Sequence, residues 1–182
     1  MAVLRIHTFP DAVLKQPARA VTAIDAALAS LAADMAETMY AAPGIGLAAP
    51  QVGVGQRLIV LDVRKADEPA GKHLLKLVNP EIVDREGEIV IEEGCLSVPD
   101  FTSDVTRARR IHLRAWTLDE QPFEIEAEDL LAVALQHELD HLDGKLFLDR
   151  LSRLKRDLYR SRRKKLARQG RDEPSSGRRV VI

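Results

Sequence analysis

The chain has 182 residues, of which 46% are apolar and 30% are charged, the usual balance of a soluble globular protein. This length suits one domain with a full-sized core. No apolar run approaches the roughly 18 to 20 residues that cross a bilayer, and the N-terminal residues lack a long apolar stretch behind a basic head. The single cysteine, Cys95, excludes a disulfide within the chain. We therefore expect a cytoplasmic protein without a membrane segment.

The formal net charge of −1 conceals an uneven distribution. Residues 1–152 hold 15 Lys and Arg against 25 Asp and Glu, whereas residues 153–182 hold 12 against 3. An acidic body therefore carries a basic tail. Such a tail is either a solvated helix face or a surface for electrostatic contact with RNA.

Periodicity predicts a first helix over residues 24–40, where apolar side chains recur every three or four residues. The stretch "GIGLAAPQVG" follows, with Gly44, Gly46 and Ala49 at the spacing of a dinucleotide-binding turn. That turn requires a strand before it and a helix starting within it. A helix precedes this stretch instead, and Pro50 lacks the N–H that a new helix would need in its second turn. The sequence therefore excludes this type of phosphate loop.

The middle of the chain is rich in β-branched and aliphatic segments separated by Gly, Pro and acidic turns. These segments predict strands over residues 57–63, 73–83, 87–92, 104–116 and 122–128. A proline-free helix is expected from Asp129 to Gly144, and a basic helix over residues 152–168. We expect an α+β fold forming one domain over residues 1–168, with residues 169–182 disordered.

The motif "HELDH" lies inside the predicted helix 129–144. Histidines four residues apart share one face, so His137 and His141 can bind one cation, and Glu138 can meet its water. Helical geometry places both rings on the apolar stripe of this helix, together with Leu130 and Val133. Buried imidazoles need partners, and a metal ion would supply one.

A third metal ligand must come from elsewhere in the chain. The downstream histidine of one zinc-peptidase class is replaced by Phe147, and the downstream glutamate of another is matched only by Glu173 in the tail. Cys95, in "EEGCLSVP", is a better candidate, although a lone cysteine is often only a small buried hydrophobe. A thiolate and two imidazoles suit zinc or ferrous iron and leave one position for water.

Three stretches, "GIGLAAPQVG", "EGCLSVP" and "QHELDH", in this order and at these separations, resemble the signature motifs of the peptide deformylase family. The similarity extends from "VLRIHTFPD" to "LSRLKR". It implies mostly antiparallel sheets packed around a central metal-binding helix, with an N-terminal and a C-terminal helix. It also implies removal of the formyl group from the N-terminal formyl-methionine of nascent polypeptides, with release of formate.

The resemblance implies one divalent ion per chain, Fe(II) in the cell, with zinc, nickel or cobalt able to replace it. The ligands implied are Cys95, His137 and His141. Glu138 would act as general base, and the Gln51 side chain and the Leu96 backbone N–H would stabilise the oxyanion.

For the substrate, the resemblance implies that Gly46 allows close approach of the peptide backbone. The other positions implied in substrate binding are Gly44, Ile45, Ile91, Gly94, Leu130, Val133, Ala134 and His137. Many bacterial relatives carry an arginine where this chain has Thr102, so contacts beyond methionine are expected to differ. We also expect an ion pair between Arg107 and Asp140 behind the ligand helix.

The expected partners are formyl-methionine nascent peptides and, through the basic C-terminal helix, the ribosome near its exit tunnel. We expect a monomer. Two alternative functions are a zinc endopeptidase using the histidine motif without Cys95, and an RNA-binding protein with a structural metal site. The first lacks its third ligand. The second would fill its fourth metal position with protein and leave Glu138 without a role.

Overall fold

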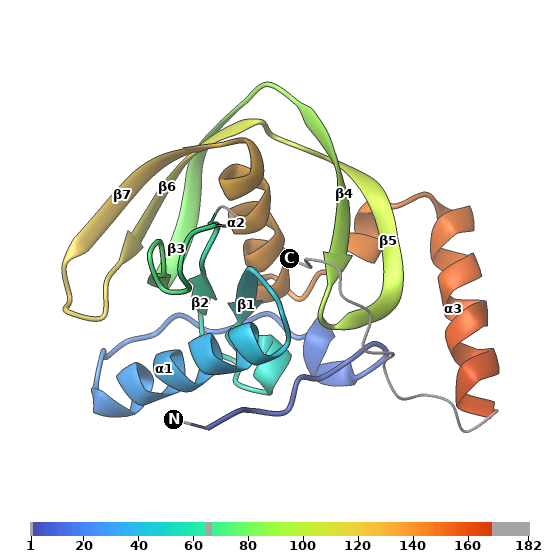
Figure 1. Cartoon of the computed structure of the whole chain (residues 1–182), viewed down its shortest axis with the longest axis horizontal. Helices are drawn as coiled ribbons and strands as arrows, with labels where there is room; N and C mark the ends of the chain where they lie inside the picture. The colour runs from blue at the N-terminus through green and yellow to red at the C-terminus, as the bar shows by residue number, and fades with distance from the viewer. Residues whose placement is uncertain (1, 65–66, 169–182) are drawn as a thin grey trace.

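The computed structural model describes residues 2–64 and 67–168, and the expectation of disorder for residues 169–182 falls outside these ranges. Helices flank a strand-rich middle, as the α+β prediction required (Figure 1). In chain order the elements are η1 (Ala12–Lys15), α1 (Ala26–Ala41), β1 (Gly46–Ala48), η2 (Ala49–Val52), β2 (Leu58–Leu61), β3 (Leu75–Glu86), β4 (Ile89–Cys95), β5 (Val98–Arg107), β6 (Arg110–Trp116), β7 (Pro122–Glu128), α2 (Asp129–Leu142), η3 (Phe147–Arg150) and α3 (Arg153–Arg168).

The strands form two antiparallel sheets. The larger has five strands in the order β1-β2-β3-β6-β7, and the smaller consists of β4 and β5 alone. Figure 1 shows α2 between the two sheets, with α1 below the five-stranded sheet and α3 outside the β4–β5 hairpin. The fold class predicted from the sequence is confirmed.

Strand β2 explains how two helices pack on one sheet. All four of its residues are buried. Successive side chains of a strand point to opposite faces of the sheet, and both faces are covered at β2. Leu58 and Val60 join the apolar cluster of α1, while Ile59 and Leu61 join the cluster of α2. Each buried side chain of this size contributes about 1.5–3 kcal/mol relative to exposure.

Helix α2 is the most enclosed element of the fold. Every residue from Ala132 to Leu142 is buried, as expected for a helix covered on all sides. It ends before Gly144, whose φ of +69° is strained for other residues. A Cβ at Gly144 would also lie 2.7 Å from the carbonyl oxygen of Lys15. Glycine therefore stops this helix and lets the N-terminal segment pass close by.

The prediction of one strand over residues 104–116 was wrong. The chain leaves the small sheet at Arg107 and joins the large sheet at Arg110. At the crossing, Gln136 of α2 accepts from Ala108 N at 3.1 Å and donates to Ala108 O at 2.8 Å. The Gln136 side chain thus supplies the hydrogen bonds of the Ala108 backbone at a point where neither sheet supplies them.

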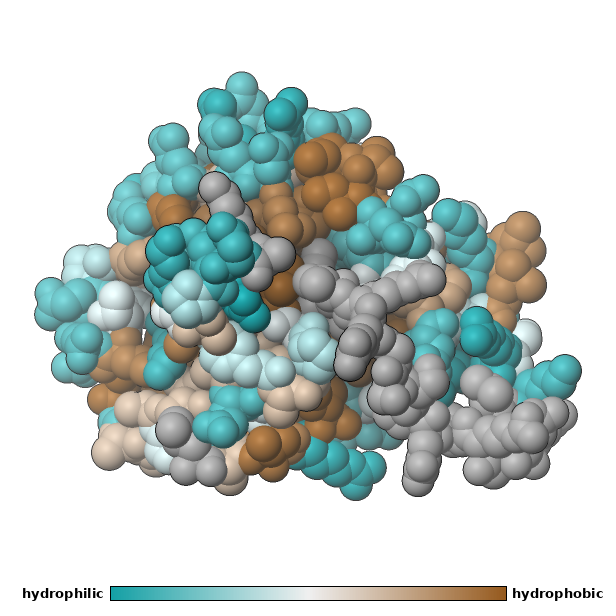
Figure 2. Space-filling view, viewed as in Figure 1, coloured by the Kyte–Doolittle hydropathy of each residue, from teal (hydrophilic) through white to brown (hydrophobic). Residues whose placement is uncertain are grey.

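Helix α3 packs on the outer face of the hairpin through Tyr159, whose ring lies 4.9 Å from that of Phe101 between centroids. Figure 2 shows apolar surface over β4 and along α3. The exposed large apolar residues of these two elements are Val90, Leu154 and Leu158. Among the described residues, no helix combines the length and apolar character needed to cross a membrane.

Candidate metal centre

The two histidines of the predicted motif lie on one buried face of α2. His137 and His141 are each 1% exposed, and their ring centroids are 5.0 Å apart. One helical turn separates them, so their nitrogens can converge on one point. This arrangement follows from the four-residue spacing in the sequence.

The sulfur of Cys95, which belongs to the two-stranded sheet, lies close to the nitrogens of these two histidines. Cys95 ends β4, and a tight turn brings the chain back at Val98, its partner in the sheet. Its Sγ lies 3.3 Å from His141 Nε2, and the three potential ligand atoms of Cys95, His137 and His141 all lie within 4.8 Å of one another. Ligands bound to one tetrahedral ion at about 2.0–2.3 Å lie roughly 3.5 Å apart, so the separations suit a metal ion.

The protonation chemistry of these side chains also suits a cation. Burial raises the pKa of the Cys95 thiol far above its usual value, despite opposing hydrogen bonds from the backbone of Ser97 and Val98. Burial, followed by the neighbouring His137, holds the pKa of His141 well below its usual value. His141 is therefore a neutral imidazole with a lone pair to give, and Cys95 needs a cation to become a thiolate.

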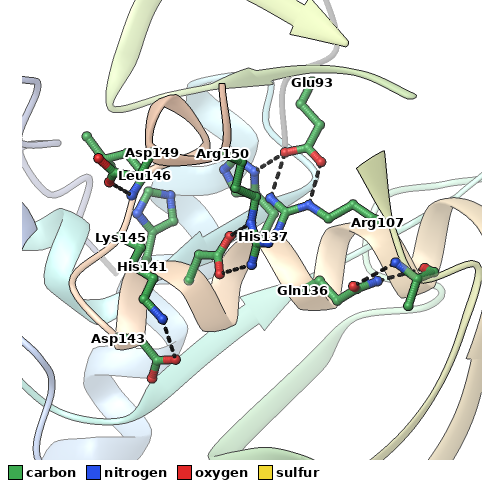
Figure 3. Close-up of polar contacts among 12 residues, drawn as sticks. Glu93, Arg107, Gln136, His137, His141, Asp143, Lys145, Leu146, Asp149 and Arg150 are labelled. Atoms are coloured by element: carbon green, nitrogen blue, oxygen red, sulfur yellow. Dashed lines mark hydrogen bonds and ion pairs between the residues drawn. The ribbon is translucent and has the colours of Figure 1, made fainter. Parts of the chain in front are cut away.

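Glu93 orients His137. Its Oε2 lies 2.8 Å from His137 Nδ1 (Figure 3). Arg107 donates from Nε to Glu93 Oε1 at 2.7 Å and from Nη2 to Glu93 Oε2 at 2.9 Å. Burial alone would raise the pKa of Glu93, but hydrogen bonds from Arg107 and His137 outweigh it and lower the pKa. An ionised Glu93 makes Nδ1 the protonated nitrogen of His137 and leaves the lone pair on Nε2. That Nε2 is buried and has no hydrogen-bond partner among the described residues.

The predicted ion pair between Arg107 and Asp140 is present. Arg107 Nη1 lies 2.6 Å from Asp140 Oδ2. Arg150, from η3, donates to the same carboxylate through Nε and Nη2, each at 2.6 Å. Burial would raise the pKa of Asp140, but the two arginines outweigh burial and lower it.

Glu138 lies beside the metal ligands with both carboxylate oxygens buried. Within the described part of the chain, neither oxygen has a hydrogen-bond partner. Burial raises the pKa of Glu138 well above its usual value, and the positive charge of Arg107 only partly opposes this. A buried carboxyl group without partners is suited to proton transfer rather than to stabilising the fold.

Gln51, in η2, points its amide toward the sulfur. Its Oε1 accepts from the backbone N–H of Ala48 at 2.8 Å, which identifies the other end of the amide as the donor. That Nε2 lies 3.1 Å from Ser97 Oγ and 3.8 Å from Cys95 Sγ. The amide therefore presents a donor to the metal centre.

Most of the apolar residues that the resemblance implied in substrate binding lie together. Ile45, Ile91, Val133 and Ala134 pack in the same apolar cluster. Leu130 differs: it was expected on the buried stripe of the helix, but it is 40% exposed and lies in the first turn of α2, ahead of the buried stretch that starts at Ala132. Gly44 lies against Leu96, and Gly46 lies against Glu138.

The sequence reasoning missed three residues of this site: Glu93, Ser97 and Arg150. For Glu93 a signal was available, since Ile91, Glu93 and Cys95 alternate along one face of a strand. For Arg150 there was none, because its contact with Asp140 depends on the path of the chain after α2.

Comparison with known proteins shows the family of this chain. The family model for polypeptide deformylase matches residues 3–157. A peptide deformylase of Alkalilimnicola ehrlichii is 54% identical over 171 residues, covering 94% of this chain and 94% of that protein.

Solved structures agree as well. A peptide deformylase from Legionella pneumophila superposes with a TM-score of 0.85 at 45% identity, covering 95% of this chain and all of that one. One from Ehrlichia chaffeensis in complex with actinonin has a TM-score of 0.84 at 39% identity, covering 91% of this chain and 98% of that one. The chain therefore belongs to the polypeptide deformylase family, hydrolases that remove the N-formyl group from nascent polypeptides.

Proposed function

We propose that this chain removes the formyl group from N-terminal formyl-methionine using one divalent ion held by Cys95, His137 and His141. The observation that carries the proposal is the buried, unpartnered Nε2 of His137, within 4.8 Å of the other two ligand atoms. The ion proposed in the cell is Fe(II), and zinc, nickel or cobalt can take its place in purified protein. When bound, such an ion acts as a Lewis acid and lowers the pKa of water.

Glu138 is the general base in this proposal. It takes a proton from the attacking water and delivers it to the amine nitrogen as the C–N bond breaks, which releases formate and a free N-terminus. Its raised pKa supports the role, because a carboxyl group with a raised pKa holds a proton more readily and can both accept and return one. Its lack of a partner in the described structure leaves its oxygens available to water.

Gln51 and the backbone N–H of Leu96 are the proposed donors to the oxyanion formed at the formyl carbon. Two contacts support the role of Gln51: the N–H of Ala48 fixes its oxygen, and Ser97 holds its nitrogen on the side of Cys95.

The substrate backbone is proposed to lie along Gly44–Gly46 and Gly94 as an added strand. Its methionine side chain is proposed to enter the apolar surroundings of Ile45, Ile91, Val133 and Ala134, with Leu130 at the rim and His137 at the inner end. Support comes from the shared cluster of the four apolar residues beside the metal ligands.

The decisive experiment measures formate release from formyl-Met-Ala-Ser by anaerobically purified protein. We expect turnover by the wild type and a loss of about 100-fold or more in Glu138→Ala, because a general base contributes on that order. The metal content of both proteins is measured in parallel. Equal rates at equal metal content would exclude Glu138 as the base, and absent turnover by metal-loaded wild type would refute the proposed activity.

We further propose that the outer face of α3 binds the ribosome near its exit tunnel. We also propose that the chain is a monomer and lies in the cytoplasm. Buried Tyr159 and Arg163 attach the helix to the domain, while Arg160, Arg162 and Lys165 remain exposed. Exposed Leu154 and Leu158 accompany these cations. A surface rich in cations is suited to contact RNA phosphates.

A further inference from the structure

Arg150 ends a chain of four alternating charges that begins at the metal centre. Glu93 contacts His137, Arg107 joins Glu93 to Asp140, and Arg150 covers Asp140 from the other side. Glu93 and Arg107 are fully buried, and the Asp140 side chain is only 7% exposed. Arg150 is the solvent-facing member, with a side chain 42% exposed.

Arg150 is needed to balance the charges of Glu93 and Asp140. Two buried carboxylates share the single guanidinium of Arg107, and one positive charge cannot compensate both. Arg150 supplies the second charge, so the four groups together are neutral. Without it, one carboxylate would remain uncompensated in the interior.

The hydrogen bonds of Arg107 and Arg150 indicate which contact would weaken if Arg150 were removed. Arg107 gives Nε and Nη2 to Glu93 and only Nη1 to Asp140. Arg150 donates to both oxygens of Asp140, including the Oδ2 that Arg107 also contacts. If Arg150 is removed, Asp140 competes with Glu93 for the donors of Arg107. The affected oxygen is Glu93 Oε2, which accepts both from Arg107 Nη2 and from His137 Nδ1.

We propose that Arg150 is a positioning residue for the metal centre, which it supports by neutralising Asp140 so that Arg107 stays on Glu93 and Glu93 holds His137 in its ligating orientation. Arg150 lies outside the three sequence motifs, on η3. This inference rests on the proposed metal site at Cys95, His137 and His141.

We expect proteins substituted at Arg150 to fold. The residue lines an open groove of about 440 Å³ between β5 and α3, together with Asp104, Ser152 and Lys155. A shorter side chain there leaves space that water can enter rather than an apolar void. Arg150→Gln therefore changes the charge of the cluster without opening the core.

The test measures how fast Zn(II)-loaded protein loses its metal to a competing chelator. We expect Arg150→Gln to release zinc about tenfold faster than wild type, the lower end of the effect of residues that orient metal ligands. Arg150→Lys, which keeps the charge but loses the paired donors, should fall between the two. The matched control is Arg57→Gln, which removes an arginine from Asp143 at the end of the same helix without touching the chain to His137.

Two outcomes would overturn the role of Arg150. One is an equal zinc-release rate for wild type and Arg150→Gln, and the other is an equal increase of that rate in Arg57→Gln. Failure of the underlying metal site is recognised separately. In that case wild type would hold no zinc, or Cys95→Ala would retain it as wild type does.

Discussion

Gly46 of β1 lies directly against the carboxylate of Glu138 of α2, and only a residue without a side chain leaves room for both. A Cβ added at Gly46 would overlap Glu138 Oε1 and press on its Cδ at 2.9 Å. The glycine of the first motif was expected to admit the substrate backbone. The structure adds a second reason for it, which is the space occupied by the proposed base.

We therefore predict that Gly46→Ala lowers kcat/KM by about 100-fold, because displacing a catalytic group by about 1 Å has effects of that size. Rates of formate release at equal metal content provide the measurement. Gly55→Ala is the matched control, since a Cβ there meets nothing within 4 Å. A Gly46→Ala enzyme as active as the control would show that Glu138 adapts without cost.

A second prediction concerns Ser97, which is fully buried and accepts from Gln51 Nε2. Ser97→Ala removes the oxygen to which that nitrogen donates and leaves it only the longer contact with Cys95 Sγ at 3.8 Å, so the amide is held less firmly. We expect kcat to fall about tenfold with little change in KM, less than the loss on deleting an oxyanion donor outright. Ser103→Ala removes another largely buried hydroxyl, one that contacts Lys155, and should leave both constants unchanged. A change confined to KM would contradict the role assigned to Ser97.

A third prediction concerns pH and the contact between Lys15 and Asp149. Burial would raise the pKa of Asp149, but the backbone N–H of Leu146 and the ammonium of Lys15 outweigh it, so the pKa is lowered. The contact therefore stabilises the fold fully above the unfolded-state pKa of about 3.9, and this stability is lost as pH falls through the folded-state pKa. Because Lys15 and Asp149 are partly exposed, we expect Asp149→Asn to cost only about 1 kcal/mol at pH 7.

Urea unfolding at a series of pH values from 7 downward checks this expectation. The difference between wild type and Asp149→Asn should shrink as the medium becomes acidic. Asp119→Asn, in the exposed turn between β6 and β7, should show little difference at any pH. A difference that grows on acidification would mean that the pKa of Asp149 is raised.

The fourth prediction concerns the outer face of α3. Replacing Arg160, Arg162 and Lys165 with glutamine should weaken cosedimentation with ribosomes and reduce its salt dependence, because fewer counterions are released when fewer phosphates are contacted. Buried Tyr159 is retained, so the helix keeps its packing on the domain. Activity on a short formyl peptide should be unchanged.

The control for charge replaces three exposed arginines elsewhere, Arg5, Arg19 and Arg85. If both triple variants lose ribosome binding equally, the interaction depends on total charge and not on α3. If neither loses it at low salt, the proposed ribosome contact is wrong.

The sequence predicted the ligand helix well, because its limits have local causes. Acidic residues precede it, no proline interrupts it, and Gly144 ends it with a positive φ. Its two histidines are buried, as expected from their position on the apolar stripe of the helix. Leu130 was placed wrongly because periodicity gives the direction of a side chain and not the extent of the layer that covers it.

The strand pattern was read less accurately. Residues 104–116 read as one strand because both halves are β-formers, and the break at Ala108 depends on Gln136 from another element. Strand β1 was missed because three residues rich in Gly and Ala carry no alternating pattern. Its identity as a strand comes from pairing with β2. Such tertiary contacts have no signature in a local window of sequence.

The origin of the three ligands has a consequence for how samples of this protein behave. Cys95 belongs to the separate two-stranded sheet, whereas both histidines belong to the helix packed on the five-stranded sheet. An ion bound there cross-links two separately hydrogen-bonded halves of the molecule. A partly loaded preparation is then a mixture of two species, and limited proteolysis should cut the β4–β5 hairpin first in the molecules that lack the ion.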